Sequence, residues 1–385
     1  MQNLKEFNFK GKKVVIRTDY DVPLNQDGEI VDDYRIKASL PTIEYLQSQG
    51  VKEIYLVAHL GRPVLRPREK FSNIQAGNVR LGLGAVALRL KELLNIDSES
   101  LNTKEIKPLG IPAYIITRGV YLLENIRFDW RETDNNGELG RQLAQLGDYY
   151  IYDAFAVAHR THASTAAAIK EARVALPGLQ LLSEIDHLDQ LKTEIKHPFV
   201  CVLGGAKAKS KIPVMQELID SVDTFLLGGV IANTFLKAEG VDVKRSTVEL
   251  AEVKESADLI KQAPQKFVLP EDYTWQSGKI MDIGQKARQN FKQKIHDAKT
   301  IFWNGTVGVT SLNAQDFKFG SEEVARAIAT NQQALKIISG GDTVGFVNEI
   351  GLNLHQFSFV STGGGATLKY LAGEKLPAME ELKRK

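Results

Sequence analysis

The chain alternates short apolar runs with longer amphipathic stretches, and no other feature of the sequence constrains the fold as strongly. The apolar runs, such as VVIRTD after residue 13 and FVCVL after residue 198, have the length of strands. The stretches between them have the length of helices. Strands that alternate with helices in this way are typical of parallel sheets with helical crossovers. The sequence therefore predicts an α/β fold, with strands that begin near residues 14, 54, 113, 120, 149, 199, 224, 267, 300, 337 and 357.

The residues that follow the predicted strands differ between the two halves of the chain. Ligands of open parallel sheets bind outside the carboxyl ends of the strands, so these residues are the first candidates for a site. They are mostly charged in the first half and glycines in the second half, which predicts two sheets with two kinds of site. The charged set is Arg17, Asp19, His59, Arg62, Glu124, Arg127, Asp153, His159, Arg160 and His162, and the glycine set is Gly204, Gly205, Gly228, Gly229, Gly305, Gly308, Gly340, Gly341, Gly363, Gly364 and Gly365.

One predicted helix lies between the two halves. In the stretch LQLLSEIDHLDQLKTEIKHP, apolar residues such as Leu181, Ile185 and Leu188 fall near helical spacing, and Pro198 ends the run. We therefore expect this segment to be one helix that joins two domains.

The composition excludes several classes of protein. The chain has 385 residues, of which 43% are hydrophobic and 25% charged, as in ordinary folded proteins. Its 49 Lys and Arg residues against 47 Asp and Glu residues leave a net charge of +2, too balanced for a general nucleic-acid or membrane-surface binder. No apolar stretch approaches the ~20 residues of a membrane span, and the amino terminus does not resemble a secretory signal, so we expect a cytoplasmic protein. The single cysteine, Cys201, lies in an apolar run and is expected to have a packing role.

Four arginines of the first half predict a site for a small, strongly anionic ligand. A guanidinium group binds phosphate and carboxylate oxygens through paired, charge-assisted hydrogen bonds. Each arginine alone could instead pair with a surface acid. Their recurrence at successive strand ends favours the anion site. The four are Arg35, Arg62, Arg127 and Arg160.

His159 and His162 have the spacing HxxH, which raises the possibility of a metal site. No third His or Cys ligand is spaced nearby to complete it. The sequence therefore favours contact with an anion, or structural hydrogen bonds, over a zinc ion.

The glycine-rich strand ends of the second half predict a phosphate site, because backbone N–H groups can approach phosphate oxygens closely there. Neither a P-loop nor a convincing strand-linked GxGxxG motif is present. Lys207 and Lys211 would share one face if a helix began in GGAKAKSK, where they could hold phosphates or simply lie on a solvated face. Asp342, in SGGDT, precedes a predicted helix, where it could bind Mg²⁺ through one carboxylate, or cap the helix. Together these features predict phosphoryl transfer between a nucleotide and an anionic acceptor.

The following motifs occur in this order along the chain: RTDYDVPL, YRIKASLPTI, HLGRP, LLENIRF, DAFAVAHRTHAST, LGGAKAKSKI, GGVIANTFL, MDIG, FWNGTVGV, GGDT and STGGGATL. This series resembles the phosphoglycerate kinase family over essentially the whole chain. The resemblance implies two Rossmann-like domains, here residues 1–178 and 198–370, joined by a helix and linker at 179–197, with a tail at 371–385 that returns to the first domain. It also implies reversible phosphoryl transfer between 1,3-bisphosphoglycerate and ADP, giving 3-phosphoglycerate and ATP with Mg²⁺, across an interdomain cleft that closes in a hinge motion. A monomer that binds neither nucleic acid nor membranes is expected.

The resemblance assigns roles to matching residues of this chain. Arg35, Lys207 and Lys211 are the expected catalytic residues, and Asp342 is the expected Mg²⁺ ligand. The acceptor carboxylate is already ionised at pH 7, so no general base is needed. The substrate set is Asp19, Asp21, Arg35, His59, Arg62, Arg127 and Arg160, and the nucleotide set is Gly204, Gly205, Lys207, Lys211, Gly228, Gly229, Asn304, Gly340, Gly341, Asp342, Thr343, Gly363, Gly364 and Gly365.

Several residues depart from the family pattern. Asp21 replaces the usual asparagine and adds a carboxylate where an anionic substrate should lie. The replaced glutamate at Thr310-Ser311 normally contacts the ribose, so nucleotide affinity or base preference could change. These departures leave two alternatives open: a non-catalytic or weakly active relative that binds a phosphorylated metabolite or a protein partner, and a kinase for another carboxylated phosphate ester. On the nucleotide side the departures are Ser210, Val230, Gln285, Thr306, Thr310, Ser311 and Ser339.

Overall fold

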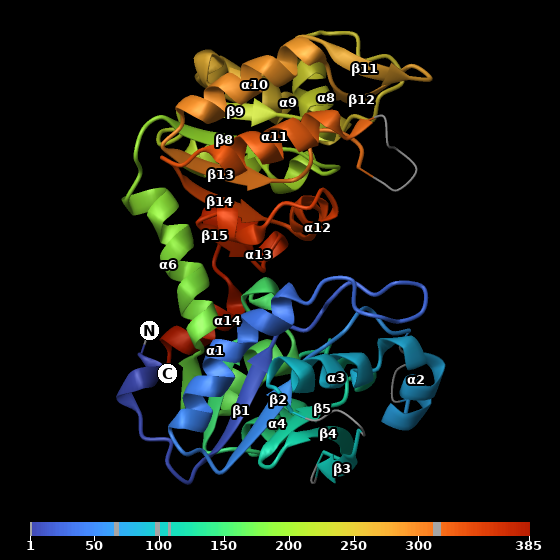
Figure 1. The fold of residues 1–385 in the computed structure, drawn as a ribbon, viewed down its shortest axis with the longest axis vertical. Coiled ribbons are helices and arrows are strands. Elements are labelled where there is room, and N and C mark those ends of the chain that lie inside the picture. Colours follow the sequence, from blue (N-terminus) through green and yellow to red (C-terminus); the bar gives the residue numbers. More distant parts are fainter. Residues whose placement is uncertain (1, 65–68, 97–100, 107–108, 311–316) are drawn as a thin grey trace. The chain divides into compact units, whose positions relative to one another are not determined.

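The computed structural model describes residues 2–64, 69–96, 101–106, 109–310 and 317–385. The chain divides into two compact units. Unit 1 consists of Met1–Glu184 together with Lys375–Lys385, and unit 2 consists of Ile185–Glu374. The division falls inside helix α6 (Leu179–Thr193), which the sequence analysis treats as a separate linker. Figure 1 shows the chain as a ribbon and labels most of the elements of both units.

Unit 1 is built on a seven-stranded sheet with the strand order β3-β4-β5-β2-β1-β6-β7. The five strands from β5 to β7 run parallel, which confirms the predicted class for this half of the chain. The strands of unit 1 are β1 (Lys13–Thr18), β2 (Glu53–Val57), β3 (Thr103–Ile106), β4 (Ile111–Thr117), β5 (Val120–Leu123), β6 (Tyr149–Asp153) and β7 (Ala175–Pro177), and its helices are α1 (Tyr34–Ser48), α2 (Phe71–Gly77), α3 (Gly84–Leu93), α4 (Gly137–Ala144), α5 (Ala168–Glu171), the first part of α6, and α14 (Pro377–Lys383).

The run near residue 113 departs from the parallel arrangement. It forms β4, which pairs antiparallel with both β3 and β5. Only Arg118 and Gly119 separate β4 from β5, and a parallel pair needs a crossover of a dozen or more residues. Gly119 has a φ of 84°, a conformation that glycine adopts without strain. The short turn therefore dictates the antiparallel pair.

The hydrophobic core of unit 1 lies where helices α1 and α3 pack on the central strands. Ile16 of β1 and Leu56 of β2 are completely buried in the same cluster as Ile43 of α1 and Leu90 of α3. Strands of a parallel sheet that is covered by helices read as continuous apolar runs rather than as alternating ones. This explains why the runs in the sequence show no alternation.

Unit 2 is built on a six-stranded sheet that is parallel throughout, with the strand order β10-β9-β8-β13-β14-β15. Strands β11 and β12 follow β10 in the chain and form a separate antiparallel hairpin. The strands are β8 (Phe199–Leu203), β9 (Thr224–Leu227), β10 (Phe267–Val268), β11 (Tyr273–Gln276), β12 (Lys279–Ile283), β13 (Thr300–Asn304), β14 (Leu335–Ser339) and β15 (Phe359–Ser361), and the helices are α7 (Ile212–Leu218), α8 (Gly229–Ala238), α9 (Val253–Gln262), α10 (Gln285–Asp297), α11 (Phe319–Thr330), α12 (Gly341–Glu349) and α13 (Gly365–Leu371).

Helix α14 comes from the last residues of the sequence and packs against α5 and β7 of unit 1. Its side chains Met379 and Leu382 are buried, and the backbone N–H of Ala378 donates to the carbonyl oxygen of Ala158 at 3.2 Å. These contacts tie residues 375–385 to unit 1, although unit 2 separates them in sequence.

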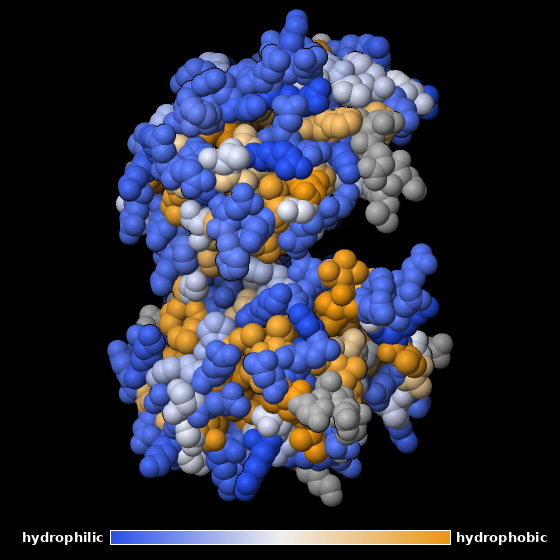
Figure 2. All heavy atoms as spheres, viewed as in Figure 1, coloured by the Kyte–Doolittle hydropathy of each residue, from blue (hydrophilic) through white to orange (hydrophobic). Residues whose placement is uncertain are grey.

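Hydrophilic residues cover most of the visible face of each unit, as Figure 2 shows. In the described part of the chain, no helix is both long enough and apolar enough to cross a membrane.

Candidate functional site

The predicted anion site of unit 1 corresponds to a cavity of about 410 Å³. Three of the four predicted arginines line it: Arg62, Arg127 and Arg160. Among its described lining residues there is no Asp or Glu. The remaining residues of the lining are Pro63, Thr133, His159 and His162.

The fourth arginine, Arg35, belongs to the same region through its contacts with two predicted substrate residues. Its Nη1 lies 3.2 Å from Oδ2 of Asp19 and donates to the backbone oxygen of Asp21 at 2.7 Å. Arg35 is the second residue of α1, whose start is set directly after the loop that carries Asp32 and Asp33. The structure therefore brings Arg35, Asp19 and Asp21 together.

The positive charges of the arginines lie close together around this cavity. Burial, followed by the charge of Arg160, lowers the pKa of Arg127 to about 10. Burial, followed by the charges of Arg127 and Arg160, lowers the pKa of His162 to about 3, so this ring is neutral at pH 7. Arg127 donates through Nη1 to the carbonyl oxygen of Gly61, while its buried Nε has no hydrogen-bond partner among the described residues. An anion in the cavity would offset the repulsion between these positive charges.

His59 and Asp21 form a pair whose protonation can be worked out from their neighbours. Nη2 of Arg17 lies 3.2 Å from Nδ1 of His59, and because a guanidinium only donates, Nδ1 accepts. The ring proton therefore sits on Nε2, which lies 3.5 Å from Oδ2 of Asp21. Burial raises the pKa of Asp21, but His59, the N–H of Gly61 at 2.7 Å and the charge of Arg35 together lower it well below its usual range.

A buried network holds Arg17 beneath this pair. Arg17 is 1% exposed, and its Nε donates to Oγ of Ser164 at 2.8 Å. Ser164 in turn donates to Oε1 of Glu132 at 2.6 Å. Glu132 is completely buried, so its charge balances that of Arg17 through one hydroxyl group. Arg17 stands at a predicted strand end without a predicted role. Glu132 and Ser164 are not among the predicted site residues, because only the fold brings these three residues together.

The neutral state of His59 predicts how stability depends on pH. Burial lowers its pKa to about 4 in the folded chain, against about 6.5 when unfolded. Above pH 6.5 neither state binds the proton, and as the pH falls towards 4 only the unfolded state takes it up. His59 therefore lowers the free energy of unfolding by up to about 3 kcal/mol between pH 6.5 and pH 4.

Urea unfolding of the parent and of His59→Gln at pH 7 and pH 4.5 measures this contribution. We expect the parent to lose more stability than His59→Gln on acidification, and the difference isolates His59 from other titrating groups. Equal losses in the two proteins would show that the ring of His59 is protonated in the folded state.

The metal interpretation of His159 and His162 gains no support. Nδ1 of His162 lies 3.8 Å from Oε1 of Glu132. Within the described residues, no three His, Cys, Asp or Glu side chains are grouped so that they could hold a metal ion. Both histidines line the arginine cavity instead.

The second site lies at the carboxyl ends of the central strands of unit 2. The parallel register sets Asn304 of β13 beside Leu203 of β8 and Ser339 of β14. Nδ2 of Asn304 donates to the carbonyl oxygen of Ser339 at 3.0 Å. The hydroxyl of Thr343 accepts from the N–H of Gly305 at 2.7 Å. Asn304 and Thr343 therefore hold the strand ends together, and their assignment as nucleotide contacts stays a prediction.

The glycines of this region have different structural roles. A Cβ on Gly204 would lie 2.2 Å from the backbone oxygen of Thr306, so packing between strand ends requires a glycine there. Gly340 has a φ of 99° and is the N-cap of α12. A Cβ on Gly341 would meet nothing within 4 Å, so this position opens onto free space.

A cavity of about 760 Å³ adjoins these strand ends, a volume suited to a nucleotide-sized ligand. Gly205, Gly229, Gly341 and Asp342 of the predicted nucleotide set line it, while Gly204, Lys207, Lys211, Gly228, Asn304, Gly340, Thr343, Gly363, Gly364 and Gly365 are not part of its lining. The lining also contains residues that sequence analysis does not assign, among them Asn233, Thr247, Ile280, Asp282, Val307, Phe346 and Glu349.

The two lysines do not share a helix face, contrary to the conditional expectation from their spacing. A 3₁₀ turn covers Ala208–Ser210, and α7 begins only at Ile212. The cause is Pro213, because a helix that began earlier would need the backbone N–H that proline lacks. Lys207 is exposed in extended backbone, whereas Lys211 is 8% exposed.

Lys211 nevertheless lies near the phosphate side of the site. Its Nζ is 3.8 Å from the point where a Cβ on Gly205 would sit. Burial lowers the pKa of Lys211, while the nearby carboxylates of Asp342 and Glu249 raise it. The ammonium group is thus buried beside a backbone that lines the cavity.

Asp342 lies in the first turn of α12, where Gly340 rather than Asp342 is the N-cap. The capping role that the sequence leaves open is therefore filled by another residue. The side chain of Asp342 is exposed at the cavity. A single carboxylate next to a phosphate cradle fits Mg²⁺, which usually takes one or two carboxylates and phosphate oxygens.

The departures from the family pattern gather around the cavity. Val230, Thr306 and Thr310 line it. The hydroxyl of Ser210 donates to the carbonyl oxygen of Lys207 at 3.1 Å, and Gln285 is the first residue of α10. Ser311 lies outside the described residues.

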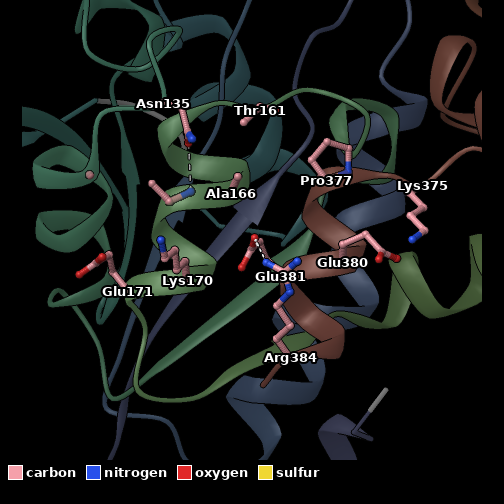
Figure 3. A pocket seen from close by; sticks show the side chains of 12 residues that line it. Asn135, Thr161, Ala166, Lys170, Glu171, Lys375, Pro377, Glu380, Glu381 and Arg384 are labelled. Carbon is pink, nitrogen blue, oxygen red and sulfur yellow. Dashed lines mark hydrogen bonds and ion pairs between the residues drawn. The ribbon is translucent and has the colours of Figure 1, made fainter.

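A further cavity of about 450 Å³ lies in unit 1 between α14 and α5 and is drawn in Figure 3. Its charged groups are largely paired within the fold. Glu381 lies 2.7 Å from Arg384, as the dashed line shows, and Glu171 lies 3.3 Å from Arg141. This cavity therefore lacks the uncompensated positive charge that marks the arginine cavity.

Comparison with known proteins gives one family. The family model described as phosphoglycerate kinase matches residues 4–374. The phosphoglycerate kinase of Desulfosudis oleivorans is 37% identical over 408 residues, covering 100% of this chain and 99% of that protein. The phosphoglycerate kinase of Aquifex aeolicus is 39% identical over 406 residues, covering 99% and 98%.

Solved structures give the same result. The structure of phosphoglycerate kinase from Coxiella burnetii matches with a TM-score of 0.78 and 32% identity, covering 99% of this chain and 98% of that chain. The phosphoglycerate kinase structure from Pyrococcus horikoshii matches with a TM-score of 0.81 and 28% identity, covering 100% and 98%. These two likenesses extend over both units.

Proposed function

Because the chain belongs to the phosphoglycerate kinase family, we infer that it transfers a phosphoryl group between 1,3-bisphosphoglycerate and ADP, giving 3-phosphoglycerate and ATP. The chain is thus a phosphotransferase with a carboxyl group as acceptor and ADP or ATP as co-substrate. One structural observation carries the assignment of substrate to unit 1. Arg62, Arg127 and Arg160 line a cavity that has no acid among its described lining residues, as an anionic substrate requires.

We assign the acceptor to this arginine cavity and the nucleotide to the cavity of unit 2. Arg62, Arg127 and Arg160 bind the phosphate and carboxylate oxygens of the acceptor. His59 is neutral and holds Asp21, which lies with Asp19 and Arg35 next to the same region. Gly205, Gly229 and Gly341 line the cavity for the nucleotide.

The transfer itself needs positioning and charge neutralisation rather than a base. The carboxylate of 3-phosphoglycerate is ionised at pH 7 and attacks without losing a proton. Lys207, Lys211 and Arg35 neutralise the transferring phosphoryl group. Asp342 would hold Mg²⁺, which supplies further neutralisation of the phosphate charge when it is bound.

In-line transfer also requires the acceptor oxygen and the terminal phosphorus to meet while water is excluded, because water would hydrolyse the acyl phosphate. We therefore propose that the two units close on each other during turnover. We further propose a cytoplasmic monomer, in keeping with a glycolytic reaction between small soluble metabolites. Nucleic acid and membranes are not expected among its partners.

The function is tested by ADP formation from MgATP and 3-phosphoglycerate, with Asp21→Asn measured beside the parent. We expect turnover by both proteins and a KM for 3-phosphoglycerate about fivefold lower in Asp21→Asn. The reason is that one like charge at about 4 Å opposes an anion by about 1 kcal/mol in water. The side chain of Asp21 is one-third exposed, so solvent screens its charge, and the value for water applies to it.

Asp258→Asn is the control, because Asp258 is an exposed residue of α9 in unit 2 and its removal changes the net charge equally. A KM that rises in Asp21→Asn would show that the substrate needs this carboxylate. Absence of turnover in both proteins would favour the non-catalytic alternative, and faster turnover of another carboxylated phosphate ester would identify a different acceptor.

A further inference from the structure

Asn233 carries the only side-chain amide of helix α8, and it lies among mostly apolar residues. It is 4% exposed, and its neighbours Ile231, Ala232, Phe235 and Leu236 are buried hydrophobic residues. A buried amide is costly unless its donor and its acceptor both find partners. The hydrogen bonds of Asn233 therefore need a full account.

Only half of this side chain is satisfied. Its Nδ2 donates to the backbone oxygen of Thr247 at 3.2 Å. Its Oδ1 is buried and has no hydrogen-bond partner among the described residues. Because Nδ2 must face the carbonyl of Thr247, the amide cannot turn around to use its oxygen there.

A purely structural role accounts for the donor but not for the acceptor. The loop that contains Thr247 is already tied to α8 by Thr234, whose hydroxyl accepts from the N–H of Glu249 at 3.2 Å. The bond from Asn233 to Thr247 adds to this tie. Oδ1 contributes nothing to it, and leaving an acceptor buried and unpaired destabilises the chain.

The position of Asn233 points to a ligand as the missing partner. Asn233 and Thr247 line the same cavity as Gly205, Gly341 and Asp342, which lie on its phosphate side. The lining also contains apolar side chains, including Ile280, Val307 and Phe346. An apolar wall of this kind suits a flat aromatic ring, with a few polar groups that fix its orientation.

We propose that Oδ1 of Asn233 accepts a hydrogen bond from the base of the bound nucleotide and makes this chain selective for adenine. The inference rests on the proposed function, which places ADP and ATP in this cavity. The exocyclic 6-amino group carries the only N–H donors on the base of ADP. A hydrogen bond from that base to Oδ1 must therefore come from the 6-amino group.

The experiment compares the affinities of two nucleotides for the full chain by calorimetry in the presence of Mg²⁺. The probes are ADP and purine riboside 5′-diphosphate, which has hydrogen in place of the 6-amino group. The parent is expected to bind ADP about tenfold more tightly, since the second ligand leaves Oδ1 unpaired. This comparison needs no substitution and is independent of how a variant folds.

Two variants then assign the selectivity to Asn233. In Asn233→Leu, which has a similar volume but no acceptor, the ratio of the two affinities is expected to fall close to one. Thr234→Val disturbs the same loop from the same helix without touching the cavity lining, so its ratio should stay near ten. A merely structural Asn233 would change both affinities equally and leave the ratio unaltered.

The outcomes separate this inference from the function on which it rests. Equal affinities of the parent for the two nucleotides, or a tenfold ratio that persists in Asn233→Leu, would overturn the role of Asn233 while leaving the kinase intact. A parent that binds neither nucleotide would overturn the proposed function itself.

Discussion

Replacing Lys211 by methionine is expected to reduce kcat by about 10²- to 10³-fold. Methionine keeps the length of the side chain but removes the ammonium group. Lys211 is 8% exposed and lies beside Gly205 and Asp342, so its charge acts where water screens it poorly. Removing one fixed donor to a charge that develops in a transition state typically has an effect of this size. Steady-state rates of ADP formation with saturating MgATP and 3-phosphoglycerate measure it.

The control is Lys209→Met, because Lys209 is exposed two residues away and the substitution removes the same charge. We expect its kcat to stay within about twofold of the parent, since an exposed charge is well screened. If Lys211→Met raised KM and left kcat unchanged, Lys211 would bind the ground state of the nucleotide and not the transferring group. Lys207→Met tests the second lysine, which is exposed in this structure.

Deleting residues 375–385 is expected to destabilise unit 1 by at least about 4 kcal/mol. The deletion removes α14 and uncovers the surface of α5 and β7 on which it packs. Leu376, Met379 and Leu382 are all at least 95% buried. Each buried side chain of this size contributes about 1.5 to 3 kcal/mol. Hydrogen exchange followed by mass spectrometry measures the effect separately in the two units.

We expect amides of β6 and β7 to lose protection in the truncated chain, while amides of β8 and β13 keep theirs. Leu382→Ala should reproduce part of the effect. Lys383→Ala is the matched control, because this neighbouring side chain is 57% exposed and its contact with Glu380 lies on the surface. Unchanged exchange in unit 1 after truncation would show that α14 contributes no stability to it.

The strands of this fold can be predicted from sequence because parallel strands covered on both sides must be apolar along their whole length. The same property means that an apolar run does not reveal whether its strand lies parallel or antiparallel to its neighbours. The run near residue 113 reads like the others, and only the two-residue connection Arg118-Gly119 reveals that β4 is antiparallel. A tight connection therefore carries more information about topology here than the apolar run itself.

The residues of the site that could be predicted are those whose chemistry is unusual at a strand end. The arginines of unit 1 and the glycines of unit 2 stand out in this way. Arg17, Glu132 and Ser164 could not be connected in advance, since their network depends on three segments that meet only in the folded chain. Asn233 could have been noticed in the sequence. It is the only side-chain amide in the mostly apolar stretch GGVIANTFL, and a buried amide needs hydrogen-bond partners.

The return of α14 to unit 1 has a consequence for the order in which the chain can fold during synthesis. Residues Ile185–Glu374 form unit 2 from one continuous segment, so this unit can be completed as soon as that segment has left the ribosome. Unit 1 begins first but has to wait for Lys375–Lys385. Until then the apolar surface under Met379 and Leu382 stays open to chaperones and to aggregation. The first unit to be translated is thus the last to be completed.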